Sequence, residues 1–151
     1  MNWSHAFAIE SLMNTTPREI IENAIPVLAV ADVSASIRFY CDLLDFQCDW
    51  TGSAEPLYIA SVSRDGHAIM LERRSPAAPG CVWIGTSGLA QLWERVRSSG
   101  KITVVKRPTN QTFALEMKIK DPDGNILWFG TAPLKDVPFG QEPPDGRPWA
   151  S

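Results

Sequence analysis

The stretch "KDPDGNILWFG", residues 120–130, joins a tight-turn sequence to a strand that is apolar on both faces. Its first part favours a turn, because proline presets the backbone, glycine accepts positive φ and aspartate side chains bond to nearby amides. In the strand that follows, period-two alternation places Ile126 and Trp128 on one face and Leu127 and Phe129 on the other. Two apolar faces require two covering layers.

The same order of elements is predicted twice along the chain. In the first half a strand precedes a helix that Asp32 or Ser34 would cap, and three strands follow, the last two joined by an Asp65-Gly66 turn. The second half repeats this order, with Gly100 just beyond the end of its helix. The predicted ranges are 24–31, 32–46, 46–52, 56–64 and 67–74, then 81–85, 86–100, 101–107, 111–120 and 125–130.

Each half therefore has the pattern β-α-β-β-β over about 50 residues, a repeat length typical of copies that pack together. A four-stranded sheet covered by one helix has one buried face and one open face. The strand 125–130 is apolar on both faces because one packs under a helix and the other must be covered by the other half or by a second chain.

Two motifs, "VADVSASIRFYCDLLDF" (30–46) and "DPDGNILWFG" (121–130), resemble the vicinal-oxygen-chelate superfamily. The chain looks most like its glyoxalase, bleomycin-resistance and extradiol-dioxygenase group, over about residues 24–132. The resemblance implies an α+β fold of two tandem βαβββ modules, about 24–74 and 81–130, that form incompletely closed mixed β-sheet barrels. It also implies a homodimer.

Members of this family that use a metal place four ligands, mostly His, Gln and Glu, on strands that face a shared cavity. By the resemblance these positions fall on Ile25, Met70, Cys81 and Trp128. None is a His, Gln or carboxylate, and one thiolate among Ile, Met and Trp does not form a catalytic metal site. The resemblance is therefore closest to the metal-free bleomycin-resistance type, and no cofactor is expected.

The resemblance also fixes which side of each strand faces the cavity. The set expected under the helices is wholly apolar, whereas the cavity set mixes aromatic, thioether and charged side chains, as in a ligand cavity. The cavity set is Ile25, Val27, Ala68, Met70, Glu72, Cys81, Trp83, Glu116, Lys118, Ile126 and Trp128. The helix-covered set is Leu28, Val30, Ile69, Leu71, Val82, Ile84, Leu115, Met117, Ile119, Leu127 and Phe129.

Within the cavity set, Trp83 and Trp128 either fill a barrel or form an aromatic slot for a flat ligand, and two indole N–H groups would be costly filler. Glu72 and Glu116 are interpreted as carboxylates at the cavity rim, in water. If partly buried, they would suit a cationic ligand or act as a general base with a raised pKa. Met70 completes the predicted ligand-binding set.

The remaining chemistry-bearing residues have simpler interpretations. Cys81 is expected to be an inert core residue, with a reactive thiol as the alternative. His67 is expected on the surface and His5 in the N-terminal appendage. Asp121 and Asp123 are interpreted as turn formers.

Composition limits the class of protein. The chain has 151 residues, is 44% hydrophobic and carries a net charge of −3, as expected for one globular domain that does not bind nucleic acid. An odd number of cysteines, no signal-like start and no long apolar run indicate a cytoplasmic protein without a membrane span. Residues 1–23 are expected to be an appendage with a short helix from about Ala6 to Met13, and 131–151 a Pro-rich tail, laid over the surface or disordered.

The sequence thus favours a metal-free small-molecule-binding homodimer that sequesters an antibiotic, bleomycin-like or otherwise planar and cationic. One alternative is an enzyme of the same superfamily. It would be a metal-dependent lyase or dioxygenase with relocated ligands, or a metal-free isomerase that uses Glu72 or Glu116 as base. A second alternative is a subunit or regulator with a vestigial cavity.

Overall fold

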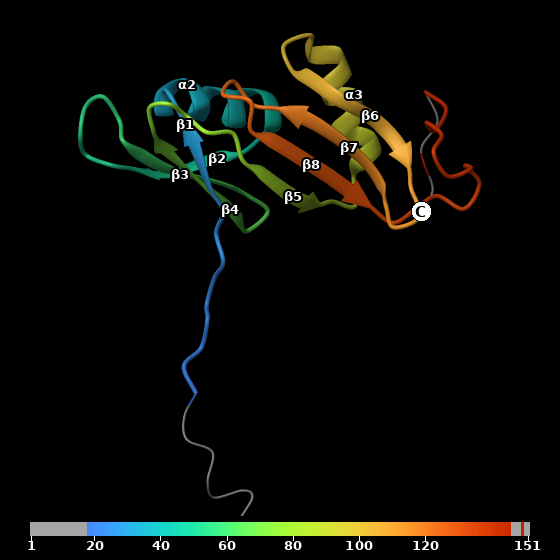
Figure 1. The fold of residues 1–151 in the computed structure, drawn as a ribbon, viewed down its shortest axis with the longest axis horizontal. Coiled ribbons are helices and arrows are strands. Elements are labelled where there is room, and N and C mark those ends of the chain that lie inside the picture. Colours follow the sequence, from blue (N-terminus) through green and yellow to red (C-terminus); the bar gives the residue numbers. More distant parts are fainter. Residues whose placement is uncertain (1–17, 146–148, 150–151) are drawn as a thin grey trace, which may run out of the picture.

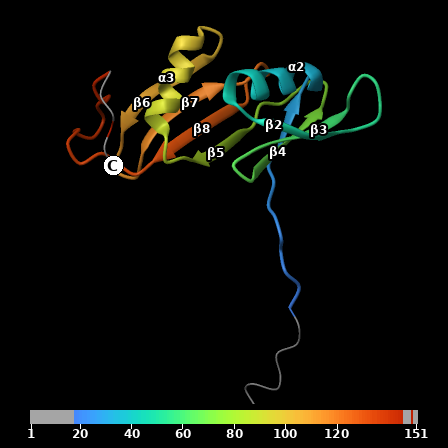
Figure 2. The same cartoon turned by 180° about the vertical axis from the view of Figure 1, so that it is seen from behind.

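The computed structural model describes residues 18–145 and 149; the predicted helix from about Ala6 to Met13, and His5, lie outside the described residues. Two four-stranded mixed sheets lie side by side, with the helices on one side of both (Figure 1). Neither sheet closes into a barrel. Figure 2 shows the same arrangement from behind, with residues 18–26 extending away on the side opposite the helices.

Each module contributes one sheet and its covering helix. The first contains β1 (Val27–Val30), α2 (Val33–Arg38), η1 (Phe39–Leu43), β2 (Gln47–Thr51), β3 (Ile59–Arg64) and β4 (His67–Arg73). The second contains β5 (Cys81–Gly85), α3 (Leu89–Ser99), β6 (Thr103–Asn110), β7 (Leu115–Lys120) and β8 (Ile126–Thr131). The sheet orders are β1-β4-β3-β2 and β5-β8-β7-β6, so the predicted βαβββ repeat is confirmed.

Several elements differ from their predicted ranges: the strands predicted to begin at 24, 56 and 111 begin at Val27, Ile59 and Leu115. The predicted helix 32–46 is capped by Asp32, whose side chain accepts a hydrogen bond from the N–H of Ala35, but it changes to a π-helical turn at 39–43. The predicted strand 101–107 continues as β6 to Asn110, through Pro108. Proline is tolerated there because β6 is an edge strand, and its pairing with β7 is irregular at this point.

The helix-covered faces of the two sheets form one apolar core. Leu28, Leu71, Leu115, Met117 and Leu127 are buried there, as the alternation predicted. Val82 and Ile84 are only partly buried because β5 is a sheet edge, but they pack against the same core. The predicted assignment of faces is confirmed on this side.

The DPDGN turn also connects the two modules. Asn125 is fully buried; its Nδ2 donates to the carbonyl of Ala29 at 2.9 Å and to Asp121 Oδ2 at 2.8 Å, and its Oδ1 accepts from the N–H of Gly80 at 2.7 Å. The Tyr40 hydroxyl of the first module donates to Asp121 Oδ2 at 3.0 Å. The turn-forming role predicted for Asp121 and Asp123 is confirmed, and the turn in addition fixes the second module to the first.

Burial of Tyr40, with the Asp121 carboxylate beside it, raises the pKa of its phenol. The hydroxyl therefore stays protonated, and remains a donor, at neutral pH and well above it. This hydrogen bond does not depend on pH near neutrality.

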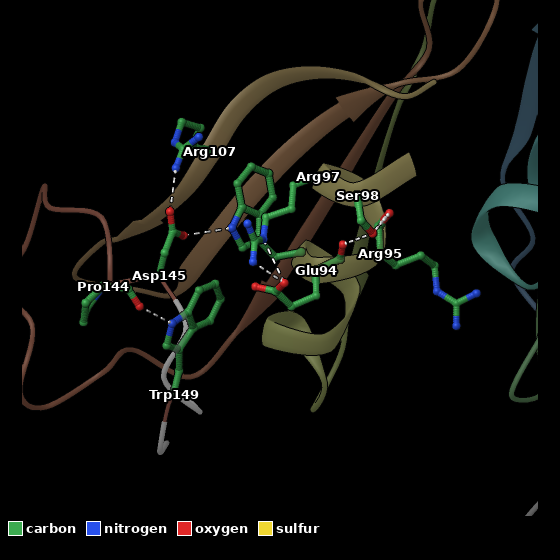
Figure 3. Close-up of polar contacts among 9 residues, drawn as sticks. Glu94, Arg95, Arg97, Ser98, Arg107, Pro144, Asp145 and Trp149 are labelled. Carbon is green, nitrogen blue, oxygen red and sulfur yellow. Dashed lines mark hydrogen bonds and ion pairs between the residues drawn. The ribbon is translucent and has the colours of Figure 1, made fainter. Parts of the chain in front are cut away.

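Residues beyond β8 pack along the second module without forming a helix or strand up to residue 145. The buried Asn110 holds them: its Nδ2 donates to the carbonyls of Leu134 and Val137, and its Oδ1 accepts from the N–H of Leu134. Further along, the guanidinium carbon of Arg107 lies 5.0 Å from the centroid of the Trp93 ring. The Nη2 atom of Arg107 also pairs with Oδ2 of Asp145 at 3.5 Å (Figure 3). The segment therefore has two attachment points.

Replacing Asn110 with alanine should loosen residues 132–138 without unfolding the domain. The three side-chain bonds to Leu134 and Val137 would be lost, but the backbone bonds of residue 110 to Gly140 and Gln141 and the contacts of Arg107 remain, so we expect a loss of only about 1–2 kcal/mol. Limited proteolysis followed by mass spectrometry should show cleavage between 132 and 138. Thr109→Ala, at the neighbouring and partly exposed position, is the control; equal protease resistance in both variants would contradict the anchoring role.

No helix within the described residues is long and apolar enough to cross a membrane.

Candidate functional site

Exposed large apolar side chains gather on the open faces of the sheets, opposite the helices. In the first sheet and the segment before it they include Ile25, Val27, Trp50 and Tyr58, and in the second module Trp83 and Phe113. The registers explain this: Val27 pairs with Met70, and Met70 with Ser61, which in turn pairs with Trp50. The alternation that buries one face exposes the other.

The second sheet brings three aromatic side chains together. Parallel pairing of β5 with β8 sets Trp83 beside Trp128, with ring centroids 5.0 Å apart and an interplanar angle of 78°. Phe113 meets Trp128 edge-on at 6.3 Å. Trp83 is 47% exposed, so this aromatic cluster presents a surface rather than filling a core. Trp83, Trp128 and Phe113 are called the aromatic cluster below.

Gly130 makes room for this arrangement. A Cβ atom at this position would lie 2.1 Å from Cη2 of Trp83 and 2.4 Å from its Cζ2. The Trp83 ring therefore lies directly on the backbone of β8, a close approach that only glycine permits.

Glu116 fixes the orientation of Trp128. It is only 3% exposed; one carboxylate oxygen accepts from Nε1 of Trp128 and the other pairs with Nζ of Lys106. The interpretation of Glu116 as a rim carboxylate in water is therefore wrong. β7 is an interior strand, and the side chains of Trp128 and Lys106 on its two neighbours cover the carboxylate.

Lys118 occupies one face of Trp128. The pairing of β7 with β8 places these residues side by side, and Nζ of Lys118 lies 4.0 Å from the centroid of the Trp128 ring. A lysine ammonium at this distance is attracted by the electrons of the indole face. Lys118 therefore belongs to the candidate site through its charge as well as its position.

Met70 and Glu72 lie on the open face of the first sheet, whereas the aromatic cluster lies on the second sheet. Glu72 accepts a hydrogen bond from the Tyr58 hydroxyl at 2.8 Å, and Arg74 donates to its other oxygen at 2.9 Å and 2.6 Å. The hydrogen bond from Tyr58, followed by those from Arg74, lowers the pKa of Glu72. A general base would need the opposite shift, so the geometry does not favour Glu72 as a base.

Replacing Tyr58 with phenylalanine should raise the pKa of Glu72 toward the ordinary value of glutamate, because the largest cause of the shift is removed. The depressed pKa contributes stability above the pKa of the unfolded chain, and that contribution is lost as pH falls through the folded-state pKa. Titration of the Glu72 carboxyl carbon by NMR measures this directly. An unchanged pKa in Tyr58→Phe would show that the hydroxyl does not bond Glu72 in solution.

The four positions to which the resemblance assigns metal ligands do not fit a metal here. Ile25 and Trp128 have no ligating atom, and the Met70 thioether and the Cys81 thiol are the only donors left. Within residues 18–145 and 149, no three His, Cys, Asp or Glu side chains gather to hold an ion. The donor set fits no catalytic divalent metal.

The structure also tests the expectations for Cys81 and His67. Cys81 is exposed, so its interpretation as a core residue is wrong; it lies on the open side of β5, an edge strand. His67 is exposed at the start of β4, as predicted.

A groove of about 930 Å³ lies between the two modules and reaches the aromatic cluster at Trp83. Its walls are residues 23–26 and 64–69 of the first module and 83–88 of the second, with side chains of α3. Sequence reasoning missed this groove, and it also missed Phe113 and Lys106. Phe113 follows β6 in a loop, where no periodicity indicates which side chain faces a site.

The match to a family model covers residues 24–129, and the model describes the glyoxalase/bleomycin resistance protein/dioxygenase superfamily. The chain belongs to this superfamily. The match spans both modules and includes all three residues of the aromatic cluster. No curated protein matches the chain significantly.

Solved structures share the fold of this superfamily member at low sequence identity. The bleomycin-binding protein of Streptomyces verticillus, solved with copper(II)-bleomycin, is 23% identical over 76% of this chain and 98% of its own, with a TM-score of 0.60. An antibiotic-binding protein from a Streptomyces species is 16% identical over 76% and 99%, with a TM-score of 0.61. A virulence protein from Salmonella typhimurium is 24% identical over 76% and 99%, with a TM-score of 0.60.

Proposed function

We propose that this protein binds a small planar molecule on the open face of its second sheet and holds it without chemical change. The aromatic cluster carries the proposal: Trp83 is half exposed, and Trp128 beside it is held in orientation by a buried carboxylate. A rigid, partly exposed aromatic surface suits stacking of a flat ligand, at about 0.5–1.5 kcal/mol per aromatic contact beyond its area burial.

Binding without turnover is supported by the acids and bases nearby. Both oxygens of Glu116 are already bonded, and the pKa of Glu72 is lowered rather than raised. The two residues considered as general bases are therefore both held as paired carboxylates. The donor set at the four ligand positions adds no support for a metal-dependent lyase or dioxygenase.

A second copy of this chain is proposed to cover the open faces. Ile25, Val27, Trp50 and Trp83 expose apolar surface there, and contiguous exposed apolar patches mark interaction sites. Residues 18–26 extend away on the same side, with Ile20 and Ile21 exposed, and in the proposed dimer they lie along the partner (Figure 2). We propose that the protein is a homodimer and that Met70 and Glu72 line the crevices which the partner completes. We also propose a cytoplasmic location, since all three cysteines are free.

Antibiotic sequestration is the specific form of this function that we propose. Two proteins with this fold are named for binding bleomycin or another antibiotic. A micromolar dissociation constant corresponds to about −8 kcal/mol, which stacking on two tryptophans plus apolar burial can supply.

Titration of purified protein with bleomycin-type glycopeptides and flat polycyclic aromatics, followed by calorimetry and tryptophan fluorescence, tests the proposal. We expect micromolar binding by at least one planar compound, recovered unchanged by mass spectrometry. Phe113→Leu should weaken binding, whereas Phe139→Leu, at an equally exposed position (61% each) in the C-terminal segment, should not. No binding by any compound would overturn the function, and a converted product would favour an enzyme.

A further inference from the structure

The charge of the ligand can be inferred from the groups around the aromatic cluster. A cationic ligand would need a free carboxylate, and the two candidate carboxylates, Glu72 and Glu116, are both already bonded to neighbouring side chains. Glu116 is paired with Lys106 and bonded to Trp128, and Glu72 is bonded to Tyr58 and Arg74. A buried carboxylate whose two oxygens are satisfied by neighbours offers little attraction to an incoming cation.

Lysines dominate the open face of the second sheet. Pairing of β6, β7 and β8 places Lys106, Lys118 and Lys120 on the same side as Trp128, against the single carboxylate of Glu116. Lys106 neutralises that carboxylate. Within the described chain, Lys118 and Lys120 form no ion pair, so this face carries excess positive charge.

Lys118 has the best position to use that charge. Its ammonium lies 4.0 Å from the centroid of the Trp128 ring, which also makes T-shaped contacts with Trp83 and Phe113 and donates its Nε1–H to Glu116. A ligand that stacks on the cluster therefore comes within reach of this ammonium. A cation in the same place would meet like charge and would have to displace Lys118 from the ring.

We propose that the ligand is a planar aromatic molecule with an anionic group, and that Lys118 binds that group while the aromatic cluster stacks its ring. This inference rests on the binding function proposed above and deepens it. A charge-assisted bond from an ammonium to a carboxylate or phenolate is stronger than a neutral one, and the ammonium is already held in place by the indole.

Three compounds of nearly equal shape test the charge: naphthoate, naphthamide and naphthylmethylammonium, titrated by calorimetry at low and high salt. We expect naphthoate to bind at least about tenfold more tightly than the ammonium compound, with the preference reduced at high salt. Lys118→Met should remove the preference and weaken naphthoate much more than naphthamide, because the amide loses at most a neutral hydrogen bond whereas the carboxylate loses a charge-assisted one. Lys118→Arg, which keeps the positive charge, should retain much of the preference for naphthoate.

Lys101→Met is the control, since it removes one positive charge at an exposed position outside the site. It should leave the order of the three affinities unchanged, and thermal unfolding should show that both lysine variants are folded. Tighter binding of the ammonium compound, or an equal loss for all three compounds in Lys118→Met, would overturn the anionic assignment.

Two further outcomes distinguish failure of the anionic ligand class from failure of the proposed binding function. If none of the three compounds binds but a neutral or cationic planar molecule does, the function stands and the anionic aromatic class is wrong. If no planar compound of any charge binds, the proposed function itself is wrong.

Discussion

Replacing Asn125 with alanine is expected to lower the free energy of unfolding by about 2–5 kcal/mol. The substitution leaves the buried carbonyl of Ala29 and the N–H of Gly80 without their partner, and removes one donor to Asp121. Each unsatisfied buried group costs about 1–3 kcal/mol. Urea unfolding followed by circular dichroism measures the change, with an unchanged slope if both states keep their exposed area.

The large effect depends on burial, and Asp123 provides the matched control. Asp123 accepts a hydrogen bond from the N–H of Ala31 at 2.9 Å and so also links the turn to the first module, but this bond is exposed. Asp123→Ala should therefore cost at most about 1 kcal/mol, since water replaces the lost partner. Equal losses in the two variants would show that the buried connection between modules does not dominate.

Replacing Gly130 with alanine is expected to weaken ligand binding at least about tenfold, or about 1.4 kcal/mol, while changing stability little. The new Cβ would lie 2.1 Å from the Trp83 ring, so the ring must leave β8. Trp83 is 47% exposed and can move into water, which keeps the stability cost small. Near-ultraviolet circular dichroism should report the lost packing of Trp83 on Trp128, and calorimetry the lost affinity.

Gly85 lies directly opposite Gly130 in the register of β5 and β8, and a Cβ there meets nothing within 4 Å. Gly85→Ala is therefore the control for adding a methyl group to this face. It should keep the near-ultraviolet spectrum and the affinity. Unchanged binding in Gly130→Ala would show that Trp83 does not contact the ligand.

The repeat and the division of each strand into two faces could be predicted because they depend on local periodicity, and the resemblance indicated which of the two faces is open. Alternation along 125–130 lies almost wholly within β8, and the helical pattern of 32–46 runs through α2 and η1, which follow each other directly. The burial of Glu116 could not be predicted. It depends on β6 and β8 lying on either side of β7, so that Lys106 and Trp128, 10 and 12 residues away, reach one carboxylate.

The exposure of Cys81 was missed for the same reason. The order of strands in the sheet decides whether β5 is an edge or an interior strand, and the spacing of residues in the sequence does not reveal that order. The π-helical turn at 39–43 was not predicted either, since its residues still follow a helical apolar pattern.

The sequence by itself determined two βαβββ modules, an apolar helix-covered face and an open face with Trp83 and Trp128. Only the tertiary structure decided the electrostatics of that open face. It pairs Glu116 with Lys106, places Lys118 over Trp128 and bonds Glu72 to Tyr58 and Arg74. Periodicity gives the side of a strand on which a residue lies, whereas the effective charge of a group depends on neighbours that the sheet brings within a few ångströms.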